Sequence, residues 1–375
     1  MLIIGLISGT SVDGIDAALV EITKLDQNIK LELIAGKTFP YAPELRAEIL
    51  AVCAGEPRAI AQICELDDAI AFAFADVANQ LMQTAKVKPD LIASHGQTVF
   101  HRPPLNSQLG YSVQLGRGAV ISKTTGIATI SDFRTADIEA GGQGAPMVSM
   151  LDLLFLAEQG NHTVVQNIGG ISNLTYLPAT FNSKNGDQVF GFDNAPGNVL
   201  MDMTSYKLFG VDYDRNGELA AQGTPDLRLI KSWLEQEFFL IPPPKSTGRE
   251  LFCPSYLDQL LSQCQHLSNH DILATLTEFT ARAIAQSYQL FLPDFPDRVL
   301  LCGGGCRNAF LVKRLKSLLA PAMVTSTEQF GINADFKEAI AFAVLGYLTW
   351  HGESGNLPKV TGAEGSRVLG KIHYA

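Results

Sequence analysis

The amino-acid sequence predicts an α/β protein made of two similar domains, each with a mixed sheet flanked by helices. Three observations support this prediction. The chain has 375 residues, whereas a single hydrophobic core usually stops growing at about 250–300 residues. The order of three strands followed by helices and further strands occurs once from residue 1 and again from residue 161. A glycine-rich turn joins the first two strands of each copy, at 9–14 and at 169–170.

The first domain, residues 1–160, opens with three strand-like segments. Leu31, Leu33 and Ala35 alternate with other residues, which is the period of a half-buried strand. Asp13-Gly14 and Asp26-Gln27-Asn28 supply the turns between these strands, because Asp, Asn and Gly tolerate turn conformations. The expected strands are 2–7, 15–22, 31–35, 90–94, 112–115 and 128–131, and the expected helices are 43–54, 58–86, 117–124 and 147–159.

The second domain, residues 161–351, repeats this order in outline. Its expected strands are 163–168, 172–177, 189–192 and 298–302, and its expected helices are 198–209, 226–239, 271–292, 309–319 and 334–351. The tail, residues 352–375, is rich in glycine and shows little periodicity. It either packs across the other domain or frays.

The composition excludes several classes of protein. With 46% hydrophobic and 18% charged residues the chain is typical of a globular enzyme. A net charge of −10 without a basic stripe excludes nucleic acid as a partner. No apolar run reaches the roughly 20 residues of a membrane span, and the short apolar N-terminus lacks the basic residues of a signal peptide. The 6 cysteines form no CxxC pair or zinc spacing, which indicates reduced thiols in the cytoplasm.

Residues 5–17 read GLISGTSVDGIDA, a turn rich in glycine and hydroxyl groups. It is not a P-loop, since the lysine of GxxxxGK[ST] is missing. It is not a dinucleotide-binding turn either, since the residues after Gly14 alternate like a strand instead of opening a helix. Backbone N–H groups near Gly9 and the hydroxyl groups of Thr10 and Ser11 suit terminal phosphates. The alternative is a plain tight hairpin.

Two further glycine motifs lie in the second domain. Residues 167–173, NIGGISN, stand at the place that corresponds to the first hairpin, so two such turns could hold a polyphosphate. Residues 301–308, LCGGGCRN, are typical of a strand, a triple glycine and a helix start. Glycine lets the backbone approach a base or ribose, and the helix dipole favours negative charge. One such turn is weak evidence, but three in this order favour a nucleotide site.

Asp193 lies in residues 190–198, FGFDNAPGN, at the end of a predicted strand and before a helix. Apolar neighbours raise the pKa of a carboxyl group and a nearby arginine lowers it. Such a position suits a general base. The alternative is an Asx-turn or a helix N-cap, and spacing alone does not decide between the two.

Polar residues follow two other predicted strands. His95, Gln97 and Thr98 come after residues 91–94, and α/β sheets bind ligands at the C-terminal ends of their strands. The imidazole, amide and hydroxyl groups suit a polyhydroxylated sugar, although a lone histidine is more often structural. Arg134, in SDFR, either grips a carboxylate through two parallel hydrogen bonds or pairs internally with Asp132 or Asp137.

These motifs together resemble the superfamily of actin, the heat-shock chaperone ATPases and sugar kinases. More closely, the chain resembles the anhydro-N-acetylmuramic acid kinase family. The segments that carry the resemblance run in the same order from residue 5 to about 346: GLISGTSVDGIDAALV, ASHGQTVFH, SDFRTADIEAGGQGAPMV, QNIGGISNLTYL, GFDNAPGNVLMD, KSTGRELF, LLCGGGCRN and ADFKEAIAFAVLG. The resemblance implies two actin-like, ribonuclease H-like domains with a cleft between them.

The resemblance also implies a site, residue by residue. Asp193 is the expected catalytic base. The expected ATP contacts are Gly9, Thr10, Ser11, Val12, Asp13, Gly14, Ile15, Asp16, Gly169, Gly170, Ser172, Asn173, Gly303, Gly304, Gly305 and Asn308. The expected sugar contacts are His95, Gln97, Thr98, Arg134 and Glu338. The helix dipole alone would also explain a carboxylate at Glu338.

The metal assignment departs from the wider superfamily. Its first phosphate motif usually carries a metal-coordinating Asp two residues before the first glycine, and here that position is Ile7. The resemblance therefore implies that Asp13, or water, takes over the contact with Mg²⁺.

The implied activity is that of a cytoplasmic carbohydrate kinase, a phosphotransferase with an alcohol group as acceptor. ATP phosphorylates 1,6-anhydro-N-acetylmuramic acid while water opens its anhydro ring, giving N-acetylmuramic acid 6-phosphate and ADP in the recycling of peptidoglycan. The two domains are expected to close on the ligands. The partner is then a small amino sugar, and a homodimer stays open.

Two alternatives to this activity remain. Another small-molecule kinase or phosphatase of the same fold would share the three glycine motifs and differ at 95–98 and at Arg134. A non-catalytic ATP switch resembling the heat-shock chaperone nucleotide domain is disfavoured, because no appended binding domain is expected after residue 351.

Overall fold

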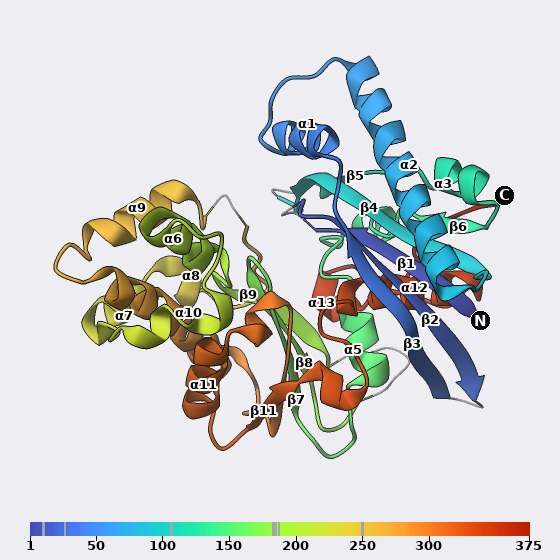
Figure 1. Ribbon diagram of the computed structural model, residues 1–375. Coiled ribbons are helices and arrows are strands. Elements are labelled where there is room, and N and C mark those ends of the chain that lie inside the picture. The colour runs from blue at the N-terminus through green and yellow to red at the C-terminus, as the bar shows by residue number, and fades with distance from the viewer. Residues whose placement is uncertain (10–11, 26–27, 106–107, 182–185, 187, 249–250) are drawn as a thin grey trace. The chain divides into compact units, whose positions relative to one another are not determined.

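Figure 1 presents a computed structural model of the chain, which describes residues 1–9, 12–25, 28–105, 108–181, 186, 188–248 and 251–375. These residues form two compact units. Unit 1 consists mainly of Met1–Phe155 and Gly331–Ala375, and unit 2 of Leu156–Phe181 and Gln188–Phe330. Each unit has its own mixed sheet flanked by helices, which confirms the predicted α/β class.

The sheet of unit 1 has the strand order β12-β6-β4-β1-β2-β3, and β5 pairs with β4. β1, β2 and β3 form an antiparallel meander, whereas β4 runs parallel to β1 and β6 runs parallel to β4. The strands are β1 (Leu2–Ser8), β2 (Ile15–Leu25), β3 (Asn28–Phe39), β4 (Leu91–Arg102), β5 (Tyr111–Leu115), β6 (Thr129–Ser131) and β12 (Lys371–His373).

Helices cover both faces of this sheet because its strands alternate apolar side chains to either side. The helices of unit 1 are α1 (Pro43–Cys53), α2 (Ile60–Ala85), α3 (Gly118–Thr125), α4 (Thr135–Glu139), α5 (Ser149–Phe155), α12 (Lys337–Trp350) and α13 (Pro358–Thr361). Ile4 and Leu6 of β1 are fully buried in one core with Phe74 of α2. The intervening Gly5 faces α12, where a Cβ atom would lie 1.8 Å from the carbonyl oxygen of Ala339.

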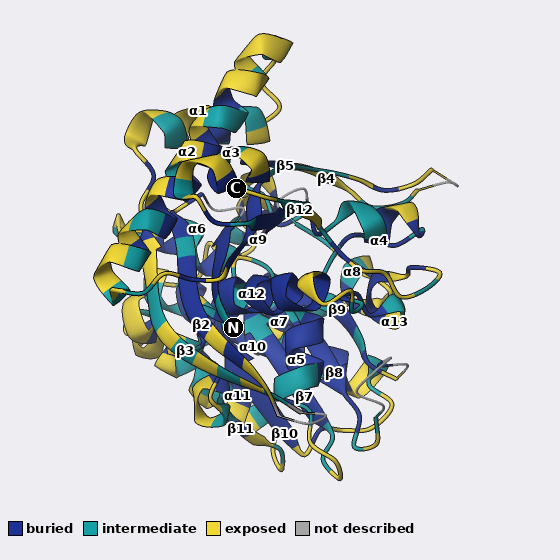
Figure 2. Cartoon of the chain, turned by 90° about the vertical axis from the view of Figure 1, so that its right-hand side faces the viewer, coloured by how far each residue is buried: buried dark blue, intermediate teal, exposed yellow. Residues whose placement is uncertain are grey.

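α12 is therefore an internal helix of unit 1, and Figure 2 shows it buried along almost its whole length. Its first residue, Lys337, forms a buried ion pair of 2.8 Å with Asp152 of α5. The domain boundary expected at residue 351 places α12 in the second domain. In the structure α12 packs with the sheet of unit 1. Contacts between segments so far apart in the sequence leave no signal in local composition.

Of the two alternatives for the tail, packing is the one that the structure shows. β12 pairs antiparallel with β6, matching Ile372 with Ile130. The Thr349 hydroxyl donates a hydrogen bond to the carbonyl of Leu369, which is fully buried. The tail is thus a structural part of unit 1.

Unit 2 repeats the topology of unit 1. Its strand order is β11-β10-β7-β8-β9, with β7, β8 and β9 antiparallel and with β10 and β11 parallel to β7. The strands are β7 (Thr163–Ile168), β8 (Ser172–Leu177), β9 (Phe190–Ala195), β10 (Arg298–Cys302) and β11 (Met323–Ser326). This order corresponds to β6-β4-β1-β2-β3, so the predicted pair of similar domains is confirmed.

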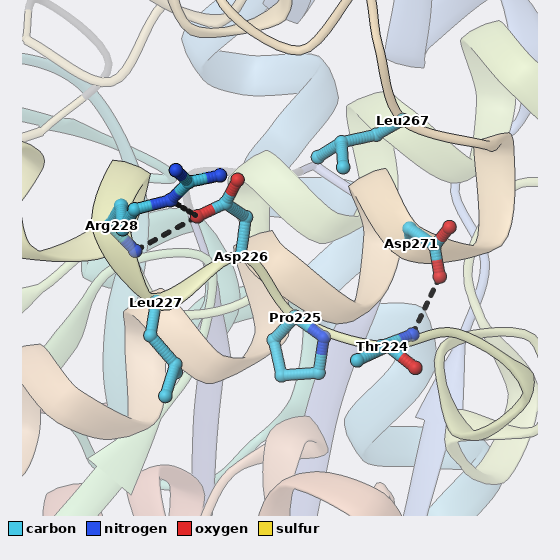
Figure 3. Close-up of a pocket in the computed structure, with 7 residues that line it drawn as sticks. All are labelled: Thr224, Pro225, Asp226, Leu227, Arg228, Leu267 and Asp271. Carbon is cyan, nitrogen blue, oxygen red and sulfur yellow. Dashed lines mark hydrogen bonds and ion pairs between the residues drawn. The ribbon is translucent and has the colours of Figure 1, made fainter.

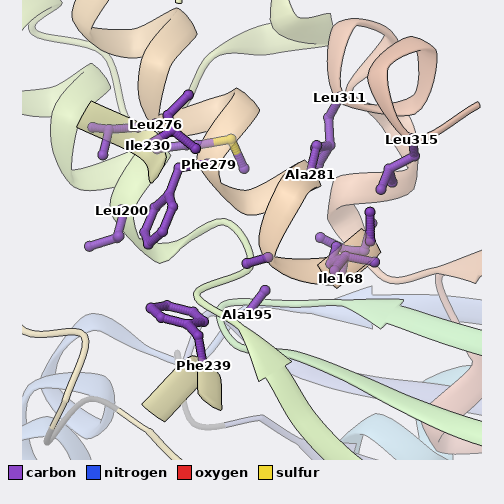
Figure 4. Close-up of a cluster of buried hydrophobic side chains, with 14 of the residues drawn as sticks. Ile168, Ala195, Leu200, Ile230, Phe239, Leu276, Phe279, Ala281, Leu311 and Leu315 are labelled. Atoms are coloured by element: carbon purple, nitrogen blue, oxygen red, sulfur yellow. The ribbon is translucent and has the colours of Figure 1, made fainter. Parts of the chain in front are cut away.

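The core of unit 2 gathers around its longest helix, α10. Figure 4 shows Leu276 and Phe279 of α10 beside Leu200 and Phe239, and burying each such side chain contributes about 1.5–3 kcal/mol. The helices are α6 (Val199–Phe209), α7 (Leu227–Leu234), α8 (Glu237–Leu240), α9 (Pro254–Ser262), α10 (Asn269–Phe291) and α11 (Ala309–Leu318), and the 3-10 turns are η1 (Arg215–Gly217), η2 (Ala220–Gln222), η3 (Gly304–Arg307) and η4 (Thr327–Phe330).

One predicted helix, 226–239, is divided in the structure. α7 ends before Glu235, and Gln236 is extended with ψ 149° before α8 begins. The Tyr256 hydroxyl donates to the Gln236 side chain at 2.8 Å, a tertiary contact that local periodicity does not encode. Among the described residues, no helix combines the length and apolar character needed to cross a bilayer.

Candidate active site

The turn between β1 and β2 in unit 1 is held by short-range hydrogen bonds. The Ser8 hydroxyl donates to the carbonyl of Gly14 at 2.8 Å, and the Val12 N–H donates to the carbonyl of Gly9 at 3.1 Å. Val12 has a left-handed backbone with φ 57°. This conformation is rare for a β-branched residue, and such strain is common at ligand-binding sites.

The two carboxylates of this hairpin have different surroundings. Asp13 is exposed and lies 3.3 Å from the Arg46 guanidinium. Asp16 is half-buried on β2 and accepts a hydrogen bond from the Thr38 hydroxyl at 2.6 Å. Burial raises the pKa of Asp16; the Thr38 hydrogen bond lowers it, and the carboxylates of Asp335 and Asp13 raise it further. Asp13 is therefore already paired with a cation, whereas Asp16 lies among other carboxylates.

Of the other predicted contacts of the hairpin, Ile15 and Gly14 are enclosed by the rest of unit 1. Thr10 and Ser11 lie outside the described residues. Ile15 is buried and pairs with Phe39 between β2 and β3, so its side chain belongs to the core. A Cβ atom at Gly14 would lie 2.6 Å from the carbonyl oxygen of Phe39. Ile15 and Gly14 can therefore offer a ligand only their main-chain groups.

β4 runs past its predicted end at Ser94 and carries the predicted sugar contacts within the strand. Gly96 has φ 75°, and a Cβ atom there would lie 2.5 Å from the carbonyl oxygen of Leu115. From Gln97 onward β4 pairs with β5. β4 is longer than predicted because β5 supplies hydrogen-bond partners to its residues from Gln97 onward, which the sequence pattern predicts as a loop.

His95 and Arg134 are brought together in unit 1. Arg134 Nε donates to His95 Nε2 at 3.0 Å, so the histidine proton lies on Nδ1, which donates to the Gly96 carbonyl at 3.0 Å. Burial, and then the Arg134 charge, hold the pKa of His95 well below 6.5, while the Gly96 contact opposes them. His95 is thus a neutral imidazole that orients the guanidinium.

Arg134 itself retains a group for a ligand. Nη1 donates to the Gly144 carbonyl at 2.6 Å, and no residue in the described part of the chain accepts a hydrogen bond from Nη2. Burial lowers the pKa of Arg134 to about 10, against the charges of Glu338 and Asp137. The internal ion pairs considered as alternatives are absent among the described residues, since Asp132 pairs instead with Lys371 at 2.7 Å.

Glu338 lies in the first turn of α12, as predicted, and shares the surroundings of Asp16 and Arg134. Burial raises its pKa and the Asp16 charge raises it further, whereas the charges of Lys337 and Arg134 lower it. Phe342, one turn further along α12, has its ring 4.5 Å from the His95 ring. Unit 1 therefore gathers Asp16, His95, Arg134 and Glu338 in one region.

Gln97 and Thr98 are engaged with other parts of unit 1. Gln97 is fully buried, and its amide donates to the Gly9 carbonyl at 3.2 Å while accepting from the Tyr41 hydroxyl at 3.3 Å. The Thr98 hydroxyl accepts from the Gln114 amide at 3.2 Å. Gln97 thus connects β4 with the β1–β2 turn, and sugar contact by either residue stays a prediction.

In unit 2, the turn between β7 and β8 is braced by the start of α6. The N–H groups of Asn198 and Val199 donate to the carbonyls of Gly169 and Gly170 at 2.8 and 3.1 Å. Gly170 is exposed, and among the described residues beyond its two chain neighbours no atom lies within 4 Å of the place that its Cβ would take. The turn is therefore held from one side and open at Gly170.

The triple glycine after β10 packs against the end of β7. A Cβ atom at Gly303, where φ is 76°, would lie 2.5 Å from Asn167 Oδ1, and one at Gly305 would lie 2.3 Å from Ile168 Cγ2. At Gly304 the nearest atom would be Asn198 Nδ2, at 3.7 Å. Glycine thus brings the predicted adenosine motif against the predicted phosphate turn.

Three other predicted nucleotide contacts have structural partners. The Ser172 hydroxyl is fully buried and accepts from the Gln166 amide at 2.9 Å. Asn308 Oδ1 accepts from the Leu311 N–H at 2.9 Å and so caps α11. Asn173 pairs with Asn167 across β7 and β8. Their role in nucleotide binding stays a prediction.

Asp193 is half-buried on β9, two residues before that strand ends. Its carboxylate accepts a hydrogen bond from the Thr247 N–H at 2.8 Å, and its own N–H donates to the Lys245 carbonyl at 3.1 Å. Neither contact is the N-cap considered as an alternative, because α6 starts after Asn198 and has no side-chain cap. The segment 245–247 therefore fixes both the backbone and the carboxylate of Asp193.

Lys245, which sequence reasoning left without a role, anchors this segment. Its side chain is only 8% exposed, and Nζ donates to the Phe238 carbonyl at 2.9 Å. The rings of Phe291, Phe238 and Phe192 lie 4.5, 4.9 and 5.7 Å from Nζ. Burial lowers the pKa of Lys245 to about 8. Its position in the quoted motif KSTGRELF was the available signal.

A second missed group is a buried polar network behind the same strands. Gln166 Oε1 accepts from Asn194 at 3.0 Å and from the Tyr288 hydroxyl at 2.9 Å, while Asn194 also donates to Ser287 at 3.1 Å. Asn194 follows Asp193 directly, so the network holds the inward side of β9. A glutamine in the otherwise apolar strand TVVQNI was the signal.

A surface pocket in unit 2, shown in Figure 3, involves none of the predicted residues. Its two carboxylates are used locally, because Asp226 accepts from the Arg228 N–H at 2.8 Å and Asp271 accepts from the Thr224 N–H at 2.6 Å. In the described part of the chain, no three His, Cys, Asp or Glu side chains are arranged to hold a metal ion.

Comparison with known proteins gives one family. A family model described as anhydro-N-acetylmuramic acid kinase matches residues 1–375. Proteins of that name from Rippkaea orientalis and Acaryochloris marina are 52% and 53% identical to this chain, and each match covers 100% of both sequences. The one from Synechocystis is 50% identical, covering 100% of this chain and 98% of the relative.

A solved structure of component A of (R)-2-hydroxyglutaryl-CoA dehydratase from Acidaminococcus fermentans aligns with a TM-score of 0.48 at 13% identity, covering 92% of this chain and 98% of that one. This similarity is too low to indicate a shared function. The full-length matches, in contrast, are decisive: the chain belongs to the anhydro-N-acetylmuramic acid kinase family.

Proposed function

We propose that this protein is an ATP-dependent kinase that phosphorylates 1,6-anhydro-N-acetylmuramic acid and opens its anhydro ring by hydrolysis. The observation that carries the proposal is 52% identity over the whole chain to a relative named anhydro-N-acetylmuramic acid kinase. Hydrolysis needs a base that activates water, and phosphoryl transfer needs positioned phosphates. The two units offer groups for each task.

Asp193 is the proposed base. It takes a proton from water as the water oxygen bonds to the anomeric carbon, and the bond from that carbon to the bridging oxygen breaks. The freed oxygen on carbon 6 attacks the γ-phosphorus of ATP, and ADP leaves. The hydrogen bonds from segment 245–247 support this role, because a base contributes most when its geometry is fixed beforehand.

For the nucleotide, we propose that Gly169-Gly170 and the β1–β2 turn contact phosphates and that Gly303–Gly305 contact adenosine. Mg²⁺ would neutralise charge on the phosphates. Oxygen ligands suit this ion, and Asp16 fits it better than the predicted Asp13, because Asp13 is already paired with Arg46.

For the sugar, the Arg134 guanidinium is the proposed partner of the lactyl carboxylate. The whole protein carries a net charge of −10, so an anionic substrate needs a local cation. The neutral His95 holds Nε of Arg134 and leaves Nη2 for the ligand. Glu338, with its raised pKa, is the proposed partner of a sugar hydroxyl.

The test is the Asp193→Asn variant in an assay coupled to ADP release. We expect turnover to fall about 100-fold to 10,000-fold, the usual worth of a positioned base, while binding of ATP and sugar is kept. Asp212→Asn, which changes an exposed aspartate of unit 2, is the matched control and should keep full activity. Near-normal turnover of Asp193→Asn would contradict the role of Asp193.

The same assay separates the alternative functions. Wild-type protein should release ADP with the anhydro sugar and not with plain N-acetylmuramic acid or without sugar. Release with plain N-acetylmuramic acid would indicate an ordinary sugar kinase. Slow release that no sugar accelerates would indicate an ATP switch.

A further inference from the structure

Asp137 is a fully buried carboxylate that the proposed mechanism does not use. It accepts hydrogen bonds both from the nearby loop at Gly144 and from the C-terminal tail. Oδ1 accepts from the Asn356 amide at 2.8 Å and from the Thr361 hydroxyl at 2.6 Å, both from the C-terminal tail. Oδ2 accepts from the Gly144 N–H at 2.9 Å. A buried charge of this kind persists only when such donors surround it.

The other side of Gly144 faces the proposed sugar site. Its carbonyl accepts from Arg134 Nη1 at 2.6 Å, and Gly144 has φ 69°, a conformation that suits glycine. Arg134 also donates to His95 at 3.0 Å. Gly144, in the loop after α4, therefore joins the buried carboxylate to the guanidinium through its own N–H and carbonyl groups.

The tail touches the same loop through its backbone as well. The Gln143 N–H donates to the Thr361 carbonyl at 2.7 Å, and the Glu364 N–H donates to the Ala140 carbonyl at 2.7 Å. Asn356 and Thr361 are 3% and 1% exposed. Hydrogen bonds from tail residues more than 200 positions away in the sequence thus hold Asp137 and the loop 140–144.

We propose that Asn356 and Thr361 of the C-terminal tail are positioning residues for the sugar site. They fix Asp137, Asp137 fixes the backbone of Gly144 through its N–H, and the Gly144 carbonyl fixes the direction of the Arg134 guanidinium. The inference rests on the proposed function, in which Arg134 binds the carboxylate of the substrate. Misplacing a binding group by about 1 Å can cost about 100-fold in rate.

The experiment compares Thr361→Val with Thr361→Ser in the full-length protein. Valine keeps the shape but removes the hydroxyl donor to Asp137, so KM for the anhydro sugar should rise about 10- to 100-fold, while KM for ATP and kcat stay near wild type. Serine restores the hydroxyl and should restore KM. Asn356→Leu, which removes the second donor, should reproduce the effect of valine.

Thr349→Val is the matched control. It removes a buried hydrogen bond from an α12 hydroxyl to the Leu369 carbonyl of the tail, without touching Asp137. It should lower stability and leave KM for the sugar unchanged. Equal sugar KM values for Thr361→Val and wild type, or a sugar KM in Thr349→Val raised as much as in Thr361→Val, would overturn the proposal. A wild-type protein without sugar-dependent turnover would instead refute the proposed function.

Discussion

At the scale of single residues, the Lys245 side chain is buried. Burial disfavours its charged ammonium form, whereas the neighbouring aromatic rings favour that form. Burial lowers its pKa from 10.5 to about 8, while three phenylalanine rings attract its charged form. The unfolded chain binds this proton more tightly than the folded protein does. Between these two pKa values the unfolded state therefore holds more protons, and the stability that depends on Lys245 rises with pH.

This sign gives a prediction for Lys245→Met, which keeps a long apolar side chain but cannot titrate. From about pH 8 to about pH 10.5 the free energy of unfolding of the wild type should rise relative to the variant, by at most about 1.4 kcal/mol per pH unit. Urea unfolding across this range measures the difference. Parallel curves would mean that the rings keep the pKa of Lys245 near its ordinary value.

At this scale the sequence predicts which residues carry the chemistry, whereas their hydrogen-bond partners are visible only in the structure. Asp193 and Arg134 each have polar neighbours that hold them, as a base and an anion-binding group require. The side chains of Ser172 and Asn308, which the sequence predicts as nucleotide contacts, also take part in a buried network and a helix cap, and their role in nucleotide binding stays a prediction. Which way a hydroxyl or amide points depends on tertiary neighbours, and a glycine-rich motif does not specify them.

At the scale of elements, the junction of β10 with β7 gives the next prediction. Gly303 combines φ 76° with a Cβ position 2.5 Å from Asn167 Oδ1. Gly303→Ala must therefore strain the backbone and also push β10 and β7 apart. We expect it to lower the free energy of unfolding by about 2–4 kcal/mol and to weaken ADP binding, as measured by urea unfolding and calorimetric titration.

Gly331 offers a control with the same backbone conformation and no crowding. Its φ is 81°, and in the described part of the chain no atom beyond its two chain neighbours lies within 4 Å of the place of its Cβ. Gly331→Ala should cost only the backbone strain, about 1 kcal/mol, and leave ADP affinity intact. If both variants lose the same stability and neither loses affinity, the close packing of the triple glycine has no bearing on the nucleotide site.

Elements were predictable where local pattern decides them. The strands 163–168, 172–177 and 298–302 have the predicted bounds, because each is a short segment with apolar side chains, in a run or in alternation, next to glycine or a turn. β12 and α9 were not predicted. β12 exists only because β6 supplies its hydrogen-bond partners, and such pairing leaves no local signal.

At the scale of the whole molecule, the order of elements in the sequence predicts two domains of similar topology. It does not predict where the boundary between the two units lies. The two sheets share one topology, which two hairpins with glycine turns already indicated. Yet α12 and the tail pack with the first sheet although they follow the second in sequence. Gly5 illustrates why the unit boundary leaves no local signal. Its lack of a side chain lets α12 pack closely against β1, and α12 lies more than 300 residues away in the sequence.

This division places the residues proposed to bind the sugar and those proposed to bind adenosine in different units. His95, Gln97, Thr98, Arg134 and Glu338 all belong to unit 1, whereas Gly303–Gly305 belong to unit 2. Hydrogen exchange measured by mass spectrometry should therefore show that the anhydro sugar alone slows exchange in the loop 140–144 and that adenosine alone slows it around 303–305. A ligand at about 100 times its Kd stabilises its binding state by about 2.7 kcal/mol, enough to slow local opening about 100-fold.

The chemistry of Arg134 makes this prediction selective. 1,6-Anhydro-N-acetylglucosamine keeps the anhydro ring and lacks only the lactyl group with its carboxylate, so at equal concentration it should protect the loop 140–144 less than 1,6-anhydro-N-acetylmuramic acid does. Protection by 1,6-anhydro-N-acetylmuramic acid confined to unit 2 would move the sugar site away from Arg134. Equal protection by both sugars would leave the site in unit 1 and remove the carboxylate from recognition, because only the guanidinium of Arg134 distinguishes the two ligands in this scheme.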